Sequence, residues 1–205
     1  AVMQLNAEDG GKRKYIMVQL PEETPEDSEA RKAGYNTIPE IAKERIRRAG
    51  KKIKEESPLT TQNLDTGFRV FRLADSNFEE VKKSPAEYDQ SQLDLFLNNV
   101  KSDRTDLDLL FGAMLSWGVQ LSLPMTSEEV DGKMIYSVND GDLVACFADD
   151  ITENIVKAMA DKHPLRVLFH DSCFSRDDAK INVFESLKQQ LDWSEEEAMK
   201  NIKVI

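Results

Sequence analysis

Short, mostly apolar runs recur along this chain and constrain its fold more than any other feature. Tyr15–Leu20, Leu143–Phe147 and Leu165–Phe169 are three of them, each bounded by turn residues or proline. Runs of about four to eight such residues are typical of strands buried on both faces of a sheet. Helical patterns separate these runs, so the sequence predicts an α/β fold.

The first part of the chain has the pattern of a βαβ unit that follows the end of another helix. Because strands of a parallel sheet need neighbours on either side, this part looks like a truncated slice of a Rossmann-like, doubly wound sheet. Residues 22–36 are polar and predict a loop. The expected elements are a helix tail at Ala1–Ala7 that ends before Gly10, a strand at Tyr15–Leu20, a helix that begins after the N-cap Thr37, and a strand at Gly67–Leu73.

The second part predicts a more complete, small α/β domain of the order ββαβαβ, preceded by a helical pattern over residues 93–117. Asn139 and Gly141 suit the positive backbone angles of a tight hairpin turn. An acidic cap at Asp149 or Asp150 opens the second helix. The expected strands are 133–138, 143–147, 165–169 and 202–205, and the expected helices between them are 149–162 and 179–190.

These patterns divide the chain into residues 1–80, a polar linker at 81–92 that carries Pro85, and a C-terminal α/β domain at 93–205. The charge follows the same division. Residues 1–80 hold 14 Lys and Arg against 15 Asp and Glu, a net charge of −1, whereas residues 81–205 hold 13 against 23, a net charge of −10. A surface that acidic repels phosphate, so we do not expect the second part to grip a nucleic acid.

No apolar run approaches the roughly 18 residues that a membrane helix needs, and the start lacks the features of a signal peptide. Cys146 and Cys173 are too few for a disulfide framework and predict two reduced, buried thiols. We therefore expect a cytoplasmic protein that has no membrane partner.

His170, Asp171, Ser172 and Cys173 place four reactive residue types together at the end of a predicted strand. A hydrolase site there is disfavoured, because the members of a catalytic triad come from different elements. Capping of the next helix by Asp171 or Ser172 is the simpler interpretation. Metal binding by His163, His170 and Cys173 lacks the usual ligand spacing, so we expect no metal.

The segment from Lys43 to Lys54 contains seven basic residues and one acidic residue, Glu44. It could contact phosphate, but a solvated helix face is the favoured interpretation. No phosphate-binding glycine-rich loop, Gly-x-Ser-x-Gly or His-Glu-x-x-His sequence is present. The residues themselves therefore indicate no catalytic group.

Several blocks in the same order resemble the modification (Mod) subunits of type III restriction–modification systems, which are β-class adenine-N6 DNA methyltransferases. The resemblance covers most of the chain. It is carried by Ala1–Glu22, Gly34–Ile38 with Ile41–Ile46, Gly67–Leu73 with Ser76–Phe78, Tyr136–Gly141, Ala145–Phe147 and Phe169–Ser172.

The resemblance implies that the full-length protein uses S-adenosylmethionine to methylate an adenine in a specific DNA sequence. It further implies that the protein forms a homodimer and joins a restriction (helicase–nuclease) subunit. In this family an Asp-Pro-Pro-Tyr block and a Phe-x-Gly-Ser-x-Thr cofactor loop precede the helix that corresponds to Ala1–Ala7. Neither block occurs here. We therefore expect a fragment that is inactive alone, binds no cofactor alone, and reaches DNA through regions it does not contain.

The family places an acidic residue at the end of the second strand, where it binds the ribose of the cofactor. Gln19 matches that position here, and Glu22 after Pro21 could substitute for it. The competing interpretation makes Gln19 a buried strand residue bonded to the backbone. Two other functions stay open, namely a stand-alone protein-interaction module without enzyme activity and, much less favoured, a small hydrolase that uses Cys173 and His170.

Overall fold

The computed structural model describes residues 1–79, 99–174 and 177–205. These residues form a mixed α/β structure that divides into two compact units, an N-terminal unit, Ala1–Phe71, and a C-terminal unit, Arg72–Ile205. The predicted linker at 81–92 and the predicted helical residues 93–98 lie outside the described residues. No helix in the described part of the chain is long and apolar enough to cross a membrane.

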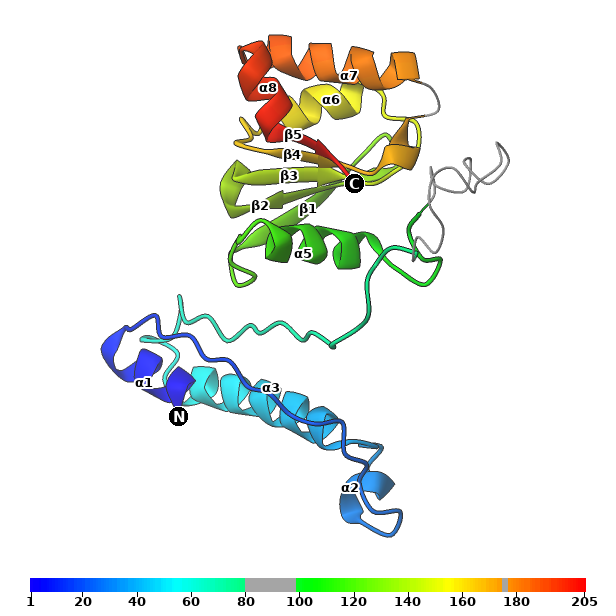
Figure 1. The fold of residues 1–205 in the computed structure, drawn as a ribbon. Coiled ribbons are helices and arrows are strands. Elements are labelled where there is room, and N and C mark those ends of the chain that lie inside the picture. The colour runs from blue at the N-terminus through cyan, green and yellow to red at the C-terminus, as the bar shows by residue number, and fades with distance from the viewer. Residues whose placement is uncertain (80–98, 175–176) are drawn as a thin grey trace. The chain divides into compact units, whose positions relative to one another are not determined.

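The N-terminal unit is built on one long amphipathic helix, α3 (Ile38–Glu56), together with α1 (Val2–Asp9) and the short α2 (Glu29–Lys32) (Figure 1). As predicted, α1 ends at Gly10 in the left-handed conformation, and Thr37 is the N-cap of α3. The backbone N–H of Thr37 donates to the Glu40 carboxylate at 3.1 Å, which satisfies one free donor of the helix start. The helix α2 lies inside the segment that we expected to be a loop.

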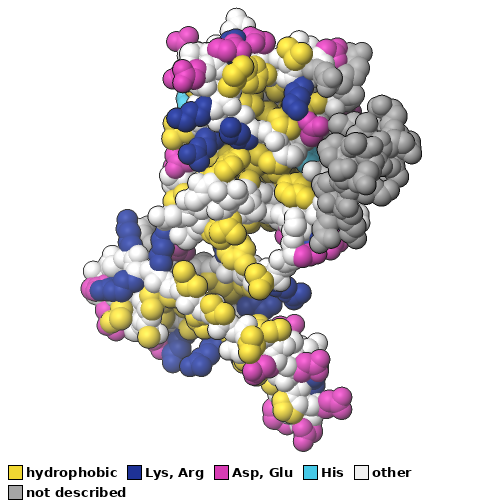
Figure 2. Space-filling model, viewed as in Figure 1, with side chains coloured by type: hydrophobic (Ala, Val, Ile, Leu, Met, Phe, Trp, Pro, Cys, Tyr) yellow, Lys and Arg dark blue, Asp and Glu magenta, His cyan; other side chains and the backbone are white. Residues whose placement is uncertain are grey.

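The two strands expected in this unit are not formed, and this part of the prediction was wrong. Residues 15–20 and 67–73 are extended but belong to no ladder among the described residues. Most of their apolar side chains are exposed (Figure 2), with Ile16 94% and Val18 93% accessible, whereas Tyr15 and Phe68 are half-buried. In a buried strand, neighbouring strands satisfy the backbone N–H and C=O groups, whereas exposed backbone can bond to water. The described residues supply no such neighbour, so the apolar pattern is present without the sheet.

The C-terminal unit contains a five-stranded mixed sheet in the order β1-β2-β3-β4-β5. The first three strands are antiparallel neighbours, whereas β3, β4 and β5 are parallel. The strands are β1 (Met125–Val130), β2 (Lys133–Val138), β3 (Leu143–Cys146), β4 (Val167–Phe169) and β5 (Ile202–Val204). Four of them were predicted; β1 was missed, although Asp131 and Gly132 form the positive-φ turn that follows it.

Helices cover both faces of this sheet and give the unit three layers (Figure 1). One face packs on α5 (Asp106–Ser116) through Leu110 and Met114. The other face packs on α6 (Glu153–Ala160) and α7 (Asp177–Gln190) through Ile155 and Leu187. The chain then forms α8 (Glu195–Asn201), a helix that the sequence analysis missed, and enters β5 directly.

Two helix starts differ from the prediction. Within residues 99–117, the described part of the expected helical pattern, the helix is α5, which begins at Asp106 after the N-cap Thr105, whose hydroxyl accepts from the N–H of Asp108. The helix α6 is capped by Thr152 rather than by Asp149 or Asp150. Thr152 can act as the cap because its hydroxyl accepts from the N–H of Ile155.

The turn between β2 and β3 holds the start of β3 against the loop that follows α6. It forms the 3₁₀ turn η3 (Asn139–Gly141), in which Asn139, Asp140 and Gly141 all have positive φ. The carbonyl of Gly141 accepts from the N–H of Leu165 at 3.0 Å. A Cβ atom at Gly141 would lie 2.5 Å from the carbonyl oxygen of Lys162, so this contact leaves no room for a side chain.

We therefore predict that Gly141→Ala destabilises the C-terminal unit far more than Gly132→Ala does. Both glycines have positive φ, but a Cβ at Gly132 meets no atom within 4 Å. The expected loss of unfolding free energy is about 3 kcal/mol or more at Gly141 and about 1 kcal/mol at Gly132. Urea unfolding followed by Trp117 and Trp193 fluorescence measures both, and equal losses would contradict the role of the Lys162 contact.

Candidate functional site

The residues expected to meet a cofactor, Gln19, Pro21 and Glu22, lie at the end of the extended segment 15–20 and are exposed. The side-chain amide of Gln19 donates to the carbonyl of its neighbour Leu20 at 3.3 Å. Its exposure excludes the interpretation that Gln19 is buried, although the backbone hydrogen bond is present. The backbone carbonyl of Glu22 accepts from the N–H of Ile38 and so fixes this segment to the start of α3.

An exposed amide and an exposed carboxylate can both accept hydrogen bonds from vicinal hydroxyl groups, which is the chemistry a ribose requires. Glu22 is held close to the first turn of α3, and its carboxylate stays free for a ligand among the described residues. These two acceptor groups therefore fit the ribose end of a nucleoside cofactor. It provides nothing for the rest of such a molecule.

The basic segment of α3 is largely paired with acidic neighbours on the same helix. Arg48 and Glu44 lie 2.7 Å apart, and Lys51 and Lys52 face Glu55 and Glu56 at 3.7 and 3.6 Å. The Arg47 guanidinium lies over the ring of Phe68, 5.7 Å from its centroid. These contacts favour the solvated helix face over a phosphate site, because exposed pairs one turn apart are typical of such faces.

In the C-terminal unit the carboxyl ends of β3 and β4 bring Asp149, His170 and Ser172 together. The Ser172 hydroxyl lies 2.6 Å from Nδ1 of His170 and 3.4 Å from Oδ1 of Asp149. The N–H of Ser172 donates to the same ring nitrogen, so His170 caps the 3₁₀ turn η4 (Asp171–Cys173). The prediction that Asp171 or Ser172 caps a helix here was wrong, because Asp171 instead pairs with Lys180 at 2.6 Å.

This arrangement does not have the geometry of a catalytic triad. In a triad the carboxylate orients the far nitrogen of the histidine, whereas here Asp149 contacts the hydroxyl. Nε2 of His170 is buried and has no hydrogen-bond partner in the described structure. Burial lowers the pKa of His170, against the opposing effect of Asp171 and Asp149, so the imidazole is held in its neutral form.

The two cysteines are buried and carry protonated thiols. The Cys173 thiol donates to the carbonyl of Cys146 at 3.6 Å, and both residues are free of disulfides. Burial raises the pKa of Cys146, and it raises the pKa of Cys173 to about 12. Because the thiolate is the nucleophile, neither residue is activated for catalysis. Within the described ranges no group of His, Cys, Asp and Glu side chains could hold a metal ion.

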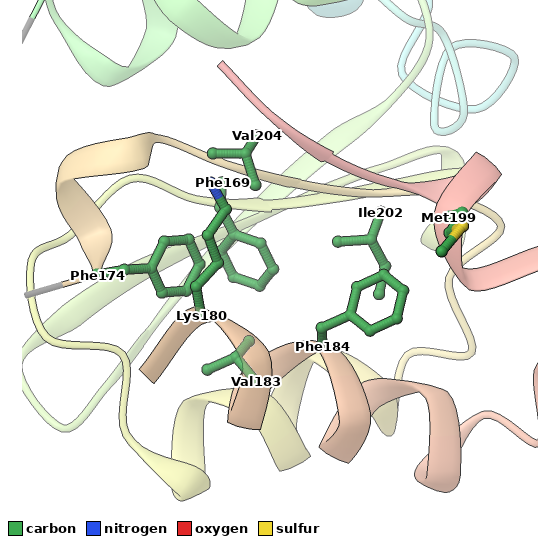
Figure 3. A pocket seen from close by; sticks show the side chains of 8 residues that line it. All are labelled: Phe169, Phe174, Lys180, Val183, Phe184, Met199, Ile202 and Val204. Atoms are coloured by element: carbon green, nitrogen blue, oxygen red, sulfur yellow. The ribbon is translucent and has the colours of Figure 1, made fainter. Parts of the chain in front are cut away.

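An apolar groove lies between β4, β5 and α7 and was not anticipated from the sequence. Figure 3 shows its side chains pointing toward one another from these elements and from α8. The groove has a volume of about 240 Å³, and Lys180 is the charged residue among its described lining residues; the others are Phe169, Phe174, Val183, Phe184, Met199, Ile202 and Val204. Phe174 meets Phe169 edge to face at 5.5 Å. The large apolar residues Phe184 and Met199, on adjacent helices, are the sequence feature that pointed to part of this groove.

We predict that neither thiol reacts with Ellman's reagent in the native chain at pH 8, and that both react in denaturant. The raised pKa of Cys173 also makes the free energy of unfolding depend on pH. The folded state holds that proton more tightly than the unfolded state, so its contribution is complete below pH 9 and is lost as the pH rises toward 12. The variant Cys173→Ala should show a smaller alkaline loss of stability. Rapid labelling of the native protein would revive the hydrolase interpretation.

Comparison with protein-family models gives no match. Two curated proteins are similar to the chain. The type III restriction-modification enzyme StyLTI Mod subunit of Salmonella typhimurium strain LT2 is 47% identical over 74 residues, which are 36% of this chain and 11% of that protein. The type III restriction-modification enzyme EcoP15I Mod subunit of Escherichia coli is 31% identical over 180 residues, which are 84% of this chain and 26% of that protein.

The second similarity covers most of the chain, so it extends across both structural units. The chain spans only about a quarter of the length of that relative. Both relatives carry the same subunit name, and their similarity agrees with the resemblance found in the sequence blocks. The chain therefore belongs to the family of type III restriction–modification Mod subunits.

Proposed function

We propose that this chain is part of an S-adenosylmethionine-dependent DNA adenine-N6 methyltransferase of a type III restriction–modification system. The observation that carries the proposal is the combination of family membership with an N-terminal unit whose apolar extended segments join no sheet among the described residues. Apolar side chains that form a continuous run, as Ile16 and Val18 do, rarely stay fully exposed in a complete domain.

The proposed reaction transfers a methyl group from the sulfonium of the cofactor to the exocyclic nitrogen of adenine. The N–C bond forms as the S–C bond breaks, the sulfonium becomes a neutral thioether, and the nitrogen releases one proton. The target base must leave the duplex to reach the cofactor. This chain would contribute only to binding in that scheme, since the Asp-Pro-Pro-Tyr block of the family is not part of it.

The extended segments 15–20 and 67–73 would be strands of a Rossmann-like cofactor sheet in the full-length protein. Each segment is linked to α3: Phe68 lies under the guanidinium of Arg47, and the carbonyl of Glu22, just after the first segment, accepts from the N–H of Ile38. Asn6 supports this arrangement, since its side chain accepts from the N–H of Arg13 at 3.1 Å and so fixes the approach to the first segment. Completion by further strands would bury the side chains that are now exposed and would satisfy their backbone groups.

Gln19 and Glu22 would then lie at the carboxyl end of the first of these strands, where open α/β sheets bind their ligands. We propose that Glu22 or Gln19 accepts hydrogen bonds from the ribose hydroxyls of the cofactor and that Pro21 fixes the turn between them. A carboxylate makes the stronger, charge-assisted bond, which favours Glu22 in that role.

The C-terminal unit would hold protein contacts, either to a second copy in a homodimer or to the restriction subunit, rather than contacts to DNA. Residues 81–205 carry a net charge of −10, which opposes the approach of a phosphate backbone. A stand-alone interaction module remains the second candidate function, because the C-terminal unit has a complete sheet with a core on each face.

Alone, the chain is expected neither to transfer methyl groups nor to bind S-adenosylmethionine tightly, because the Asp-Pro-Pro-Tyr and cofactor-loop sequences are absent from it. Titration calorimetry and transfer of labelled methyl groups to duplex DNA measure the two properties. The EcoP15I Mod subunit is the matched positive control. Micromolar binding or measurable methylation by the chain alone would refute the expectation.

A second prediction concerns DNA. When the chain is photo-crosslinked to duplex DNA at low salt, no crosslink should fall within residues 93–205, because their acidic surface repels phosphate. Peptide mapping of the crosslinked chain gives the result. Crosslinks along the C-terminal unit would overturn its assignment to protein contacts.

A further inference from the structure

The strand β5 forms one edge of the sheet and leaves backbone groups open. The N–H of Ile205 donates to the carbonyl of Phe169, and the N–H of Asp171 donates to the carbonyl of Ile205. In a parallel pair such bonds alternate along the strand, so the backbone N–H and C=O of Lys203 and Ile205 face β4, whereas those of Ile202 and Val204 face outward.

The N–H of Ile202 donates to the carbonyl of Ala198 in α8, so the open groups of the edge among the described residues are the carbonyl of Ile202 and the N–H and carbonyl of Val204. No other strand of the described residues pairs with this edge. An open edge of this kind is a template for a further strand.

The apolar groove lies along the same edge, on the α7 side of the sheet. The side chains of Ile202 and Val204 line it together with Phe184 and Met199 (Figure 3). Met199 is 62% exposed even though it belongs to this apolar set. Alternate side chains of a strand added to β5 would point into the groove, because side chains of neighbouring strands alternate in step.

The other face of the edge is cationic. Lys203 lies beside Leu168, whose side chain packs in the cluster on the α5 side, so Lys203 projects to that side. Two further cations lie near this edge. Arg166 directly precedes the residue that pairs with Ile202, and Lys200 lies in the last turn of α8, the helix that carries Met199 of the groove. All three are exposed and form no ion pair among the described residues.

We propose that this edge, which we call the β5 dock and define by Ile202–Val204, the groove and the three cations, binds an extended segment of a partner protein. The segment adds a strand to β5 and alternates apolar with acidic residues. Its apolar side chains enter the groove, and its carboxylates meet Lys203 and its neighbours. The proposal deepens the role in protein contacts proposed above by giving the chemistry of the partner.

A second copy of the chain is the less suitable occupant. Antiparallel pairing of two β5 strands about a twofold axis at Lys203 would place the two ammonium groups opposite each other. Like charges directly opposite across a strand pair are destabilising. Lysine on an edge strand is also a common device against pairing of identical edges. The same charge attracts a segment that carries carboxylates.

The test uses the whole chain and a fluorescein-labelled probe peptide that alternates valine and glutamate. Three comparison peptides isolate the contributions of charge, of alternation and of backbone hydrogen bonds. One has lysine in place of glutamate, one has the same composition in two blocks, and one has methylated backbone nitrogens on the pairing edge. Fluorescence anisotropy should show saturable binding of the alternating peptide alone. The methylated peptide tests the backbone hydrogen bonds, since it keeps every side chain.

The variant Lys203→Glu should weaken binding of the alternating peptide by about tenfold or more. Lys157→Glu is the matched control, because Lys157 is an exposed lysine on α6 that does not line the groove. Val204→Pro removes an outward N–H without removing a bond to β4 and should also abolish binding. Circular dichroism verifies that each variant is folded, and Lys203→Glu, which changes only an exposed side chain, keeps the test valid if the proline variant unfolds.

Lack of saturable binding at about 1 mM alternating peptide would overturn the proposal. Equal losses in Lys203→Glu and Lys157→Glu would also overturn it, as would a concentration-dependent dimer that Lys203→Glu alters, which would assign the edge to a second copy. The assay requires neither cofactor nor methyl transfer. Its failure is therefore distinct from failure of the proposed methyltransferase role.

Discussion

The requirement that every backbone N–H and C=O of an extended segment find a partner separates the two units of this chain. In the C-terminal unit β3 is bonded on both sides, by β2 and by β4, and its four residues are buried. Residues 15–20 have a comparable apolar sequence but no neighbouring strand in the described part of the chain, and Ile16 and Val18 are exposed to solvent. An apolar run therefore forms a buried strand only where neighbouring strands pair with it.

Backbone hydrogen bonding also explains why the reactive residues at the ends of β3 and β4 are not activated as nucleophiles or bases. The parallel strands bring His170 and Cys173 close to Cys146, at the edge where α/β sheets bind ligands. There the chain turns back through η4, and the hydrogen bonds of His170 and Ser172 are used to hold that turn. Burial then keeps the imidazole neutral and the thiols protonated. Reactive side chains alone do not make a site when their polar atoms serve the turn.

Sequence reasoning succeeded where a pattern is local and failed where the outcome depends on distant partners. The N-cap Thr37, the left-handed Gly10 and the turn at Asn139–Gly141 follow from the backbone preferences of a few residues. β1 was missed because Met125–Val130 is an edge strand with mostly exposed polar side chains, so it has no apolar run. The groove needs Phe174, Phe184 and Met199 from three elements, which no local pattern could bring together.

The two incomplete surfaces of the chain differ in the partner that they require. The N-terminal segments are continuous apolar runs, and strands of that kind are buried on both faces of a sheet, so the cofactor sheet proposed for them would need further strands and covering helices together. The edge at β5 is only three residues long, carries Lys203, and has an apolar groove on one face and cations on the other. A completing strand there must alternate, because each face selects a different side chain. The first surface therefore calls for the rest of a domain, and the second for a single short segment.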